Sequence, residues 1–261
     1  MRNGLIAALL FALAAPAAAA AEARMVRVEG GTYRPVFPPS PEEKEIPMGA
    51  FLLDERPVTN GEYLAFVKAN PRWRKGQVPR LFAGAGYLDR WEGPLLPGAK
   101  APAEAPVVEV SWFTAKAFCE AQGKRLPTEA EWEYVAAASA DAPDARQDPA
   151  FLAQLLSWYS KPNPKVFGPV GRGAPNYHGV HDLHGLIWEW VGDFNSALVV
   201  GDSREDGDPD LARFCGAGAL SAQDKSDYAA FMRIAFRSSL QASYTTKNLG
   251  FRCARDVKET K

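Results

Sequence analysis

Long periodic segments are scarce in this chain, and their scarcity limits the folds available to it. Residues 70–105 show no helical or strand-like period and are interrupted by proline, glycine and aromatic residues. A connection of this length without regular structure is usually functional or poorly ordered in a compact domain. We therefore expect short helices and strands joined by long loops.

The expected helices begin at polar capping residues followed by apolar residues at helical spacing. Capping boxes are predicted at Thr59 with Glu62 and at Thr128 with Glu131, and Ser111 caps a helix that ends at Gly123. A further helix is expected near residues 151–159. Beyond Pro175 the apolar runs are short, and no long helix is expected there.

Alternation of apolar and polar residues predicts the strands. Residues 25–33 read as a strand with a turn or bulge at Gly30 and Gly31, and residues 51–54 and 107–110 read as short strands. Residues 34–49 hold five prolines and are expected to form an irregular surface stretch.

Composition and charge exclude several classes of protein. The chain has 47% hydrophobic residues, too many for a disordered chain. Its 30 basic and 31 acidic residues give a net charge of -1, so nothing indicates a nucleic-acid partner. No internal repeat or linker is evident, and one domain over residues 25–256 is expected.

Residues 1–21 have the pattern of a secretory signal peptide. Arg2 precedes an unbroken apolar run over residues 5–14, and small residues at 17–21 suit cleavage. A retained N-terminal anchor is the alternative. No later segment has the uncharged apolar length of a membrane span. The mature protein is expected to be periplasmic or secreted.

Five stretches together resemble the formylglycine-generating enzyme family, also called the sulfatase-modifying factor family. They are MVRVEGGTY, DERPVTNGEYLAFV, APVVEVSWFTAKAFCEAQGKRLPTEAEWEYVAAA, GVHDLHGLIWEWVGDF and NLGFRCAR, in the family's order and over nearly all of the mature chain. The resemblance implies an α+β, C-type-lectin-like fold with little regular secondary structure.

The enzymes of that family oxidise a sulfatase cysteine to formylglycine with a copper-binding cysteine pair. Counted back from the terminal LGFRC, the two positions fall near Ala229 and Ile234, neither of which can bind copper. No cysteine lies between Gly216 and Arg252. Because Cu(I) is a soft ion that prefers thiolates, this departure argues against formylglycine-generating chemistry.

The chain has three cysteines. By resemblance to exported members of the family, Cys119 and Cys253 form a disulfide bond. Cys215 is left over, at a position where the family usually has an arginine. An odd thiol in an exported protein can be reactive, bind a metal or simply be buried, and burial is the favoured interpretation.

All three histidines, His178, His181 and His184, lie within seven residues. Imidazole binds copper, zinc and iron, so a transition-metal site is one interpretation. The other is structural hydrogen bonding, which we favour because side chains at this spacing on an extended backbone do not all face one way.

The family resemblance also implies a calcium site in the loop from residue 182 to residue 189. Its ligands would be the carboxylates of Asp182 and Glu189 and the backbone carbonyls of Gly185 and Ile187. These are hard oxygen donors of the kind that calcium prefers. An ion-free turn, with Asp182 bonded to backbone amides, is the alternative.

By the same resemblance, residues 227–241 correspond to the family's active-site region and make Arg233 and Arg237 candidate functional residues, with Tyr244 just beyond the segment and Cys215 before it. The arginines would bind a carboxylate or a peptide backbone, or else form ion pairs. The first hypothesis is an accessory or binding protein for an exported protein or peptide, such as a periplasmic metalloenzyme. The alternatives are a metal-dependent oxidoreductase using the histidines and Cys215 with copper or iron, or, least favoured, a formylglycine-generating oxidase.

Overall fold

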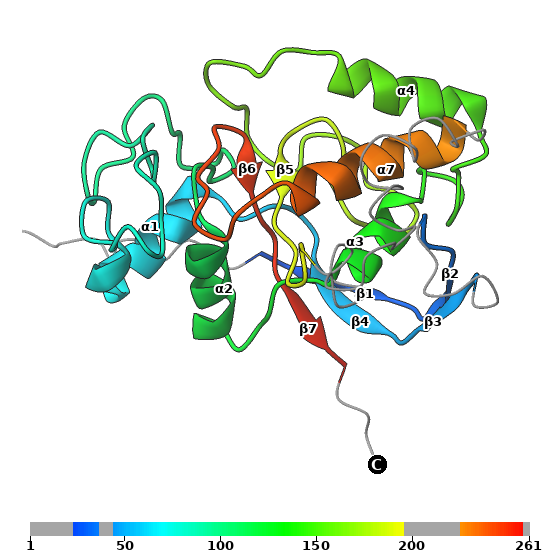
Figure 1. Ribbon diagram of the computed structural model, residues 1–261, viewed down its shortest axis with the longest axis horizontal. Coiled ribbons are helices and arrows are strands. Elements are labelled where there is room, and N and C mark those ends of the chain that lie inside the picture. The colour runs from blue at the N-terminus through cyan, green and yellow to red at the C-terminus, as the bar shows by residue number, and fades with distance from the viewer. Residues whose placement is uncertain (1–22, 37–43, 196–224, 258–261) are drawn as a thin grey trace, which may run out of the picture.

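A computed structural model describes residues 23–36, 44–195 and 225–257, shown in colour in Figure 1. Its regular elements are short, as the sequence predicts. The strands are β1 (Met25–Val28), β2 (Gly31–Tyr33), β3 (Ile46–Met48), β4 (Phe51–Asp54), β5 (Trp188–Glu189), β6 (Leu249–Gly250) and β7 (Ala254–Asp256). The α-helices are α1 (Asn60–Ala69), α2 (Trp112–Ala121), α3 (Glu129–Ala136), α4 (Pro149–Tyr159) and α7 (Lys225–Ser238). This mixture confirms the α+β class.

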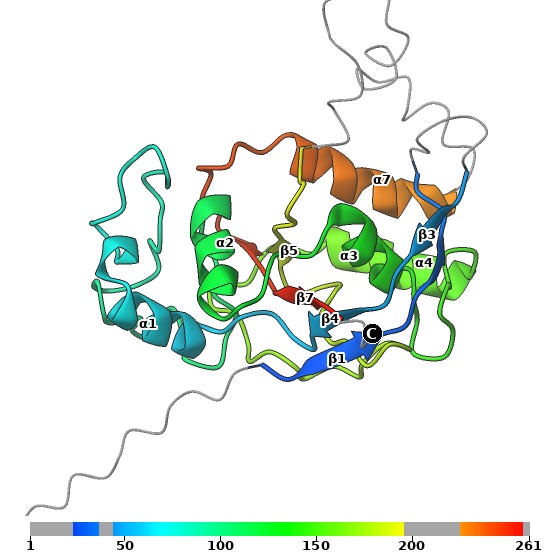
Figure 2. The ribbon, with the colours of Figure 1, turned by 90° about the horizontal axis from the view of Figure 1, so that it is seen from below.

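The strands of the described residues form three small sheets. An antiparallel sheet in the order β1-β4-β7 joins the two ends of the described chain. β2 pairs antiparallel with β3, and β5 pairs parallel with β6. In Figure 2 this first sheet lies at one side, α7 at the other, and α3 between them. Segments far apart in sequence therefore meet around α3.

The predicted capping residues are confirmed. Thr59 and Thr128 each accept a hydrogen bond from the backbone three residues later, and the glutamate at that position bonds back. Ser111 forms the same reciprocal arrangement with Thr114. Gly123, just beyond α2, has a φ of +65°, a left-handed conformation that favours glycine.

Residues 70–105 form turns and one short 3-10 helix, Pro71–Trp73. Their aromatic side chains explain how so irregular a segment is held. Tyr87 and Trp91 are buried, and the Tyr87 hydroxyl donates to the Trp73 carbonyl. The Trp91 indole donates to Asn60 on α1. The segment is therefore fixed to α1 by buried hydrogen bonds.

Three expectations about secondary structure are wrong. The stretch 34–49, expected to be irregular, contains strand β3, because residues 46–48 pair with β2. Residues 107–110 are not a strand, because Glu109 adopts a φ of +62° and bends the chain, although Val107 donates to the Val58 carbonyl. A long helix, α7, does lie beyond Pro175. Its buried face includes Arg233 and Arg237. Because these arginines stand where an amphipathic helix normally has apolar residues, the sequence does not show the helical period of apolar residues here.

The main apolar core gathers side chains from α1, α2, α3, β4, β5 and β6 and the loops between them. The disulfide bond predicted between Cys119 and Cys253 is present beside this core and links α2 to the residue before β7. Among the residues that the structure describes, no helix combines the length and apolar character needed to cross a membrane.

Candidate functional site

Helix α7 carries two arginines into the interior, where they face α3. Arg233 and Arg237 are four residues apart, so they share one face of the helix. Only 4% and 1% of their surfaces are exposed. Burying two guanidinium groups is costly unless carboxylates pair with them.

Glu133 of α3 provides that pairing. Its Oε1 accepts from Arg233 Nε at 2.9 Å and from Arg237 Nη1 at 2.8 Å, and its Oε2 accepts from Arg233 Nη2 at 2.5 Å. Burial alone would raise the pKa of Glu133, but the two arginines hold that pKa below its usual range. The Glu133 carboxylate is therefore ionised and shared by both arginines.

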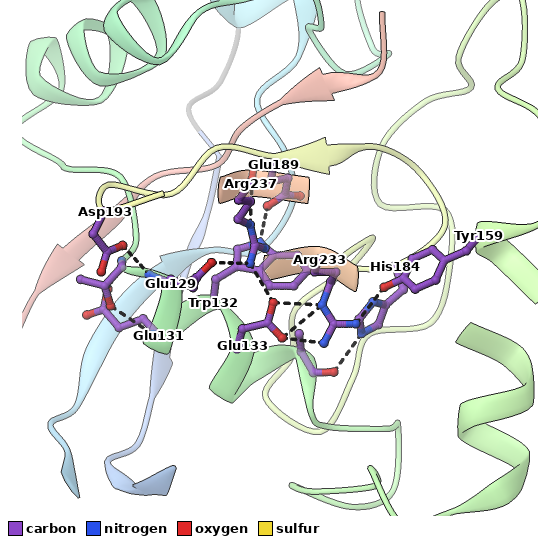
Figure 3. Close-up of polar contacts among 12 residues, drawn as sticks. Glu129, Glu131, Trp132, Glu133, Tyr159, His184, Glu189, Asp193, Arg233 and Arg237 are labelled. Carbon is purple, nitrogen blue, oxygen red and sulfur yellow. Dashed lines mark hydrogen bonds and ion pairs between the residues drawn. The ribbon is translucent and has the colours of Figure 1, made fainter. Parts of the chain in front are cut away.

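Trp132 lies beneath the same two arginines. The Arg237 and Arg233 guanidinium carbons lie 4.3 and 5.6 Å from the centre of its ring. The ring face attracts the cations, and the ring holds both guanidinium planes in place. Figure 3 shows these contacts between α3 and α7.

Glu129, one turn earlier on α3, is less well paired. Its Oε1 lies 3.5 Å from Arg237 Nη1, is buried, and accepts no hydrogen bond from the described residues. The pKa of Glu129 is raised to about 7, chiefly by burial and also by nearby Glu133 and Asp193, against the opposing effect of Arg237. We call Glu129, Glu133, Arg233 and Arg237 the α3–α7 cluster.

A cavity of about 190 Å³ opens beside this cluster. Its walls include Trp158 and Tyr159 at the end of α4 and Trp188 of β5. The Tyr159 ring stacks on the Trp188 ring with centroids 5.5 Å apart. Arg233 Nη1 donates to the Tyr159 hydroxyl at 2.8 Å and so joins the cluster to the cavity wall.

His184 also lines the cavity. Its Nε2 lies 2.8 Å from the Ala136 carbonyl oxygen, so Nε2 carries the proton and Nδ1 is an acceptor. Nδ1 is buried and has no partner among the described residues. The pKa of His184 is lowered to about 3, chiefly by burial and also by the charge on Arg233. The ring is therefore neutral at physiological pH.

The other two histidines have separate surroundings. His178 packs against the rings of Tyr134 and Tyr177. His181 Nδ1 lies 2.7 Å from the Gly173 carbonyl oxygen. No group of three or more His, Cys, Asp or Glu side chains able to hold a metal occurs among the described residues. The histidines neighbouring in sequence are thus each held by different local contacts.

The remaining candidates are dispersed. Arg233 and Arg237 line the cavity together, whereas Tyr244 is 41% exposed and is not among the lining residues. Cys215 lies outside the described residues. Ala229 and Ile234, near the positions assigned to the copper-binding cysteines, are both buried, and Ala229 packs with apolar residues of α4.

The loop expected to bind calcium has its carboxylates occupied. Arg252 donates to both oxygens of Glu189 at 2.8 Å, and the Trp132 indole donates to Glu189 Oε2 at 2.8 Å. Asp182 Oδ2 accepts from the backbone N–H of Gly171. Because a guanidinium already neutralises Glu189, these residues as arranged do not fit a calcium ion through that carboxylate. Calcium binding stays an untested prediction.

Sequence reasoning missed the acidic members of this site. Glu133 follows Trp132 within a helix whose glutamates look like solvent-facing charges. The one available signal was spacing: Glu129 and Glu133 are four residues apart, as are Arg233 and Arg237. Two such pairs can face each other across a helix contact.

Comparison with known proteins finds relatives that match most of the chain. Residues 10–257 match the sulfatase-modifying factor enzyme 1-like domain family. The chain is 32% identical to the formylglycine-generating enzyme of Streptomyces coelicolor, over 79% of this chain and 78% of that protein. It is 27% identical to the inactive C-alpha-formylglycine-generating enzyme 2 of Bos taurus, over 88% and 87% of the two chains. The solved structure of PvdO from Pseudomonas aeruginosa is 20% identical with a TM-score of 0.48, covering 89% of this chain and 94% of that one.

Proposed function

Because the chain belongs to the sulfatase-modifying factor enzyme 1-like domain family, we propose that it is a binding member of that family and not an oxidase. One observation carries the proposal: the segment from Gly216 to Arg252 has no cysteine. The copper centre of the oxidising enzymes needs two thiolates there, and buried Ala229 and Ile234 near those positions offer none.

The cavity gives such a binding protein a place for its partner. Its lining combines aromatic side chains with polar and charged ones, and ligand sites commonly pair apolar walls with polar groups that fix orientation. The fixed contacts of Tyr159 with Arg233 and Trp188 mean that little side-chain order has to be gained on binding. The similarity to a bovine protein named as inactive agrees with loss of the oxidase activity in this family.

We further propose that the protein is exported and assists the maturation of an exported metalloenzyme by holding a segment of it. The signal-like residues 1–21 motivate the export. The binding partner would place a peptide segment in the cavity beside α4 and β5.

An oxidation assay tests the loss of the oxidase. The purified chain, supplied with copper, should form no aldehyde on a sulfatase-derived peptide containing the target cysteine. The Streptomyces coelicolor relative serves as the positive control under the same conditions. Aldehyde formation by this chain would contradict the inference that a chain without these cysteines is not an oxidase.

Capture from an extract of exported proteins tests the binding role. We expect one metalloenzyme to be retained reproducibly, and Asn163→Trp, which adds bulk at the cavity, to reduce its recovery severalfold. Lys165→Trp is the matched control, because Lys165 is exposed on the same loop but does not line the cavity. Equal recovery of the metalloenzyme with both variants would show that the cavity is not where the partner binds.

A further inference from the structure

The cavity has an aromatic part whose walls support one another. Trp188 packs between Tyr159 and Phe236, with ring centroids 5.5 and 4.5 Å away. Trp158 stacks on His184 with centroids 5.7 Å apart. The volume of about 190 Å³ compares with roughly 150 Å³ for an apolar cavity that holds benzene. One aromatic side chain therefore fits.

The exposed part of the cavity is polar and carries hydrogen-bond donors. Lys161, Asn163 and Asn248 line it, and Lys161 and Asn163 are exposed. Asn248 Nδ2 donates to Asn163 Oδ1 at 3.2 Å, which orients the Asn163 amide nitrogen away from that bond. Lys161 forms no ion pair with any carboxylate in the described part of the chain.

The charge of the lining is positive. Its cations are Lys161, which forms no ion pair within the described residues, and Arg233 and Arg237, which share the Glu133 carboxylate. Glu189, the single carboxylate among the described lining residues, is bonded to Arg252. Figure 3 shows Arg233 reaching from the α3–α7 cluster to Tyr159 on the cavity wall. An anionic group near Lys161 would meet favourable charge, whereas a second cation would be repelled.

We infer that the cavity binds the C-terminal aromatic residue of a peptide, with the ring against the Trp158, Tyr159 and Trp188 side chains and the free carboxylate at Lys161 and Asn163. A C-terminal residue carries its ring and its carboxylate on one α-carbon, so it fills the aromatic and cationic parts together. This inference rests on the proposed function, since it specifies which segment of a partner the cavity holds.

Calorimetric titration with short peptides tests the inference on the whole mature chain. The probes are Gly-Gly-Phe as the free acid, the same peptide as its amide, Gly-Gly-Ala, and phenylacetate. The free acid should bind about fivefold more tightly than the amide, as expected for an exposed ion pair. Loss of the ring in Gly-Gly-Ala should weaken binding by roughly 30-fold. Phenylacetate carries a ring and a carboxylate but no peptide backbone, and it should bind more weakly than Gly-Gly-Phe.

Lys161→Gln and Lys165→Gln form a matched pair of variants. Both remove one exposed charge from the same loop, but only Lys161 lines the cavity. Lys161→Gln should weaken the free acid about fivefold and leave the amide unchanged. Lys165→Gln should change neither.

The inference is overturned if the acid and the amide bind equally, if Gly-Gly-Ala binds as well as Gly-Gly-Phe, or if the two lysine variants behave alike. Tighter binding of phenylacetate would assign the cavity to a free aromatic acid and overturn it as well. Capture of an exported partner together with failure of all peptide probes would reject the ligand class while leaving the proposed function intact.

Discussion

Around the disulfide bond, the buried charges are fully paired, whereas the α3–α7 cluster leaves acceptors without donors. Lys124 Nζ lies 2.9 Å from Asp54 Oδ1, and Asp54 Oδ2 accepts from the Cys253 backbone N–H. Arg252 bonds to Glu189 and to two backbone carbonyls. In contrast, Glu129 Oε1 and the neighbouring His184 Nδ1 are buried without partners among the described residues.

The difference separates a structural role from a binding role. A buried network whose members are all satisfied rigidifies the fold, and one with unsatisfied members costs free energy that stability alone does not explain. These two unsatisfied atoms, on His184 and Glu129, lie in and beside the wall of the cavity. We therefore expect the disulfide region to determine stability and the α3–α7 cluster to combine stability with ligand binding.

The largest effect is expected from removing the disulfide. Replacing Cys119 and Cys253 together by serine should lower the free energy of unfolding by about 4 kcal/mol, because the bond closes a loop across a sequence separation of 134 residues. Urea denaturation of the variant and the oxidised parent measures the loss. A change below about 1 kcal/mol would mean that the paired charges, and not the bond, hold this region.

Glu133→Ala should have the next largest effect, about 3 kcal/mol, because it leaves two buried guanidinium groups without their shared carboxylate. Glu29→Ala is the matched control, since Glu29 pairs with Arg27 at the exposed surface and should cost almost nothing. Urea denaturation of the two variants compares them directly. Similar losses would show that burial of the cluster contributes little.

A smaller and pH-dependent effect is expected from Glu129. Its folded pKa of about 7 is above the ordinary value of 4.5, so its contribution to stability is complete below about pH 4.5 and is lost as the pH rises through 7. Glu129→Gln removes this dependence. Between pH 4.5 and pH 8, the free energy of unfolding of the variant should rise relative to that of the parent by on the order of 2 kcal/mol.

Denaturation of parent and Glu129→Gln across that range measures the gain. Glu29→Gln, which removes an exposed carboxylate, should follow the parent at every pH. If Glu129→Gln also runs parallel to the parent, then Glu129 is not the titrating group, and the α3–α7 cluster is as fully paired as the disulfide region.

Short-range sequence signals predicted much of the fold. Capping residues such as Thr59 and Thr128 act within one helical turn, so they are readable without knowledge of the rest of the chain. The α7 helix was missed because Arg233 and Arg237 replace apolar residues on its buried face. Their pairing with Glu133 spans about a hundred residues of sequence, a separation that no local pattern encodes.

The same dependence on contacts distant in sequence explains why Glu189 was expected to bind calcium. Its sequence neighbourhood suggests a calcium ligand by resemblance, but Arg252, brought beside it by the pairing of β5 with β6, occupies both its oxygens. The sequence shows that a carboxylate stands at this position, whereas the group that donates to it depends on tertiary structure. The cavity lining, drawn from α3, α4, β5 and α7, was unpredictable for the same reason.

The smallest effect is therefore expected from calcium. If Glu189 belongs to the paired charges near the disulfide, millimolar calcium should change the melting temperature by less than about 1 °C, since the ion would have to compete with a buried guanidinium. A site occupied at a hundred times its Kd would instead add about 2.7 kcal/mol. Differential scanning calorimetry with calcium, and with magnesium as the control, distinguishes the two outcomes. A saturable rise specific to calcium, abolished by Asp182→Asn, would establish the ion site and show that the pairing of Glu189 with Arg252 does not prevent it.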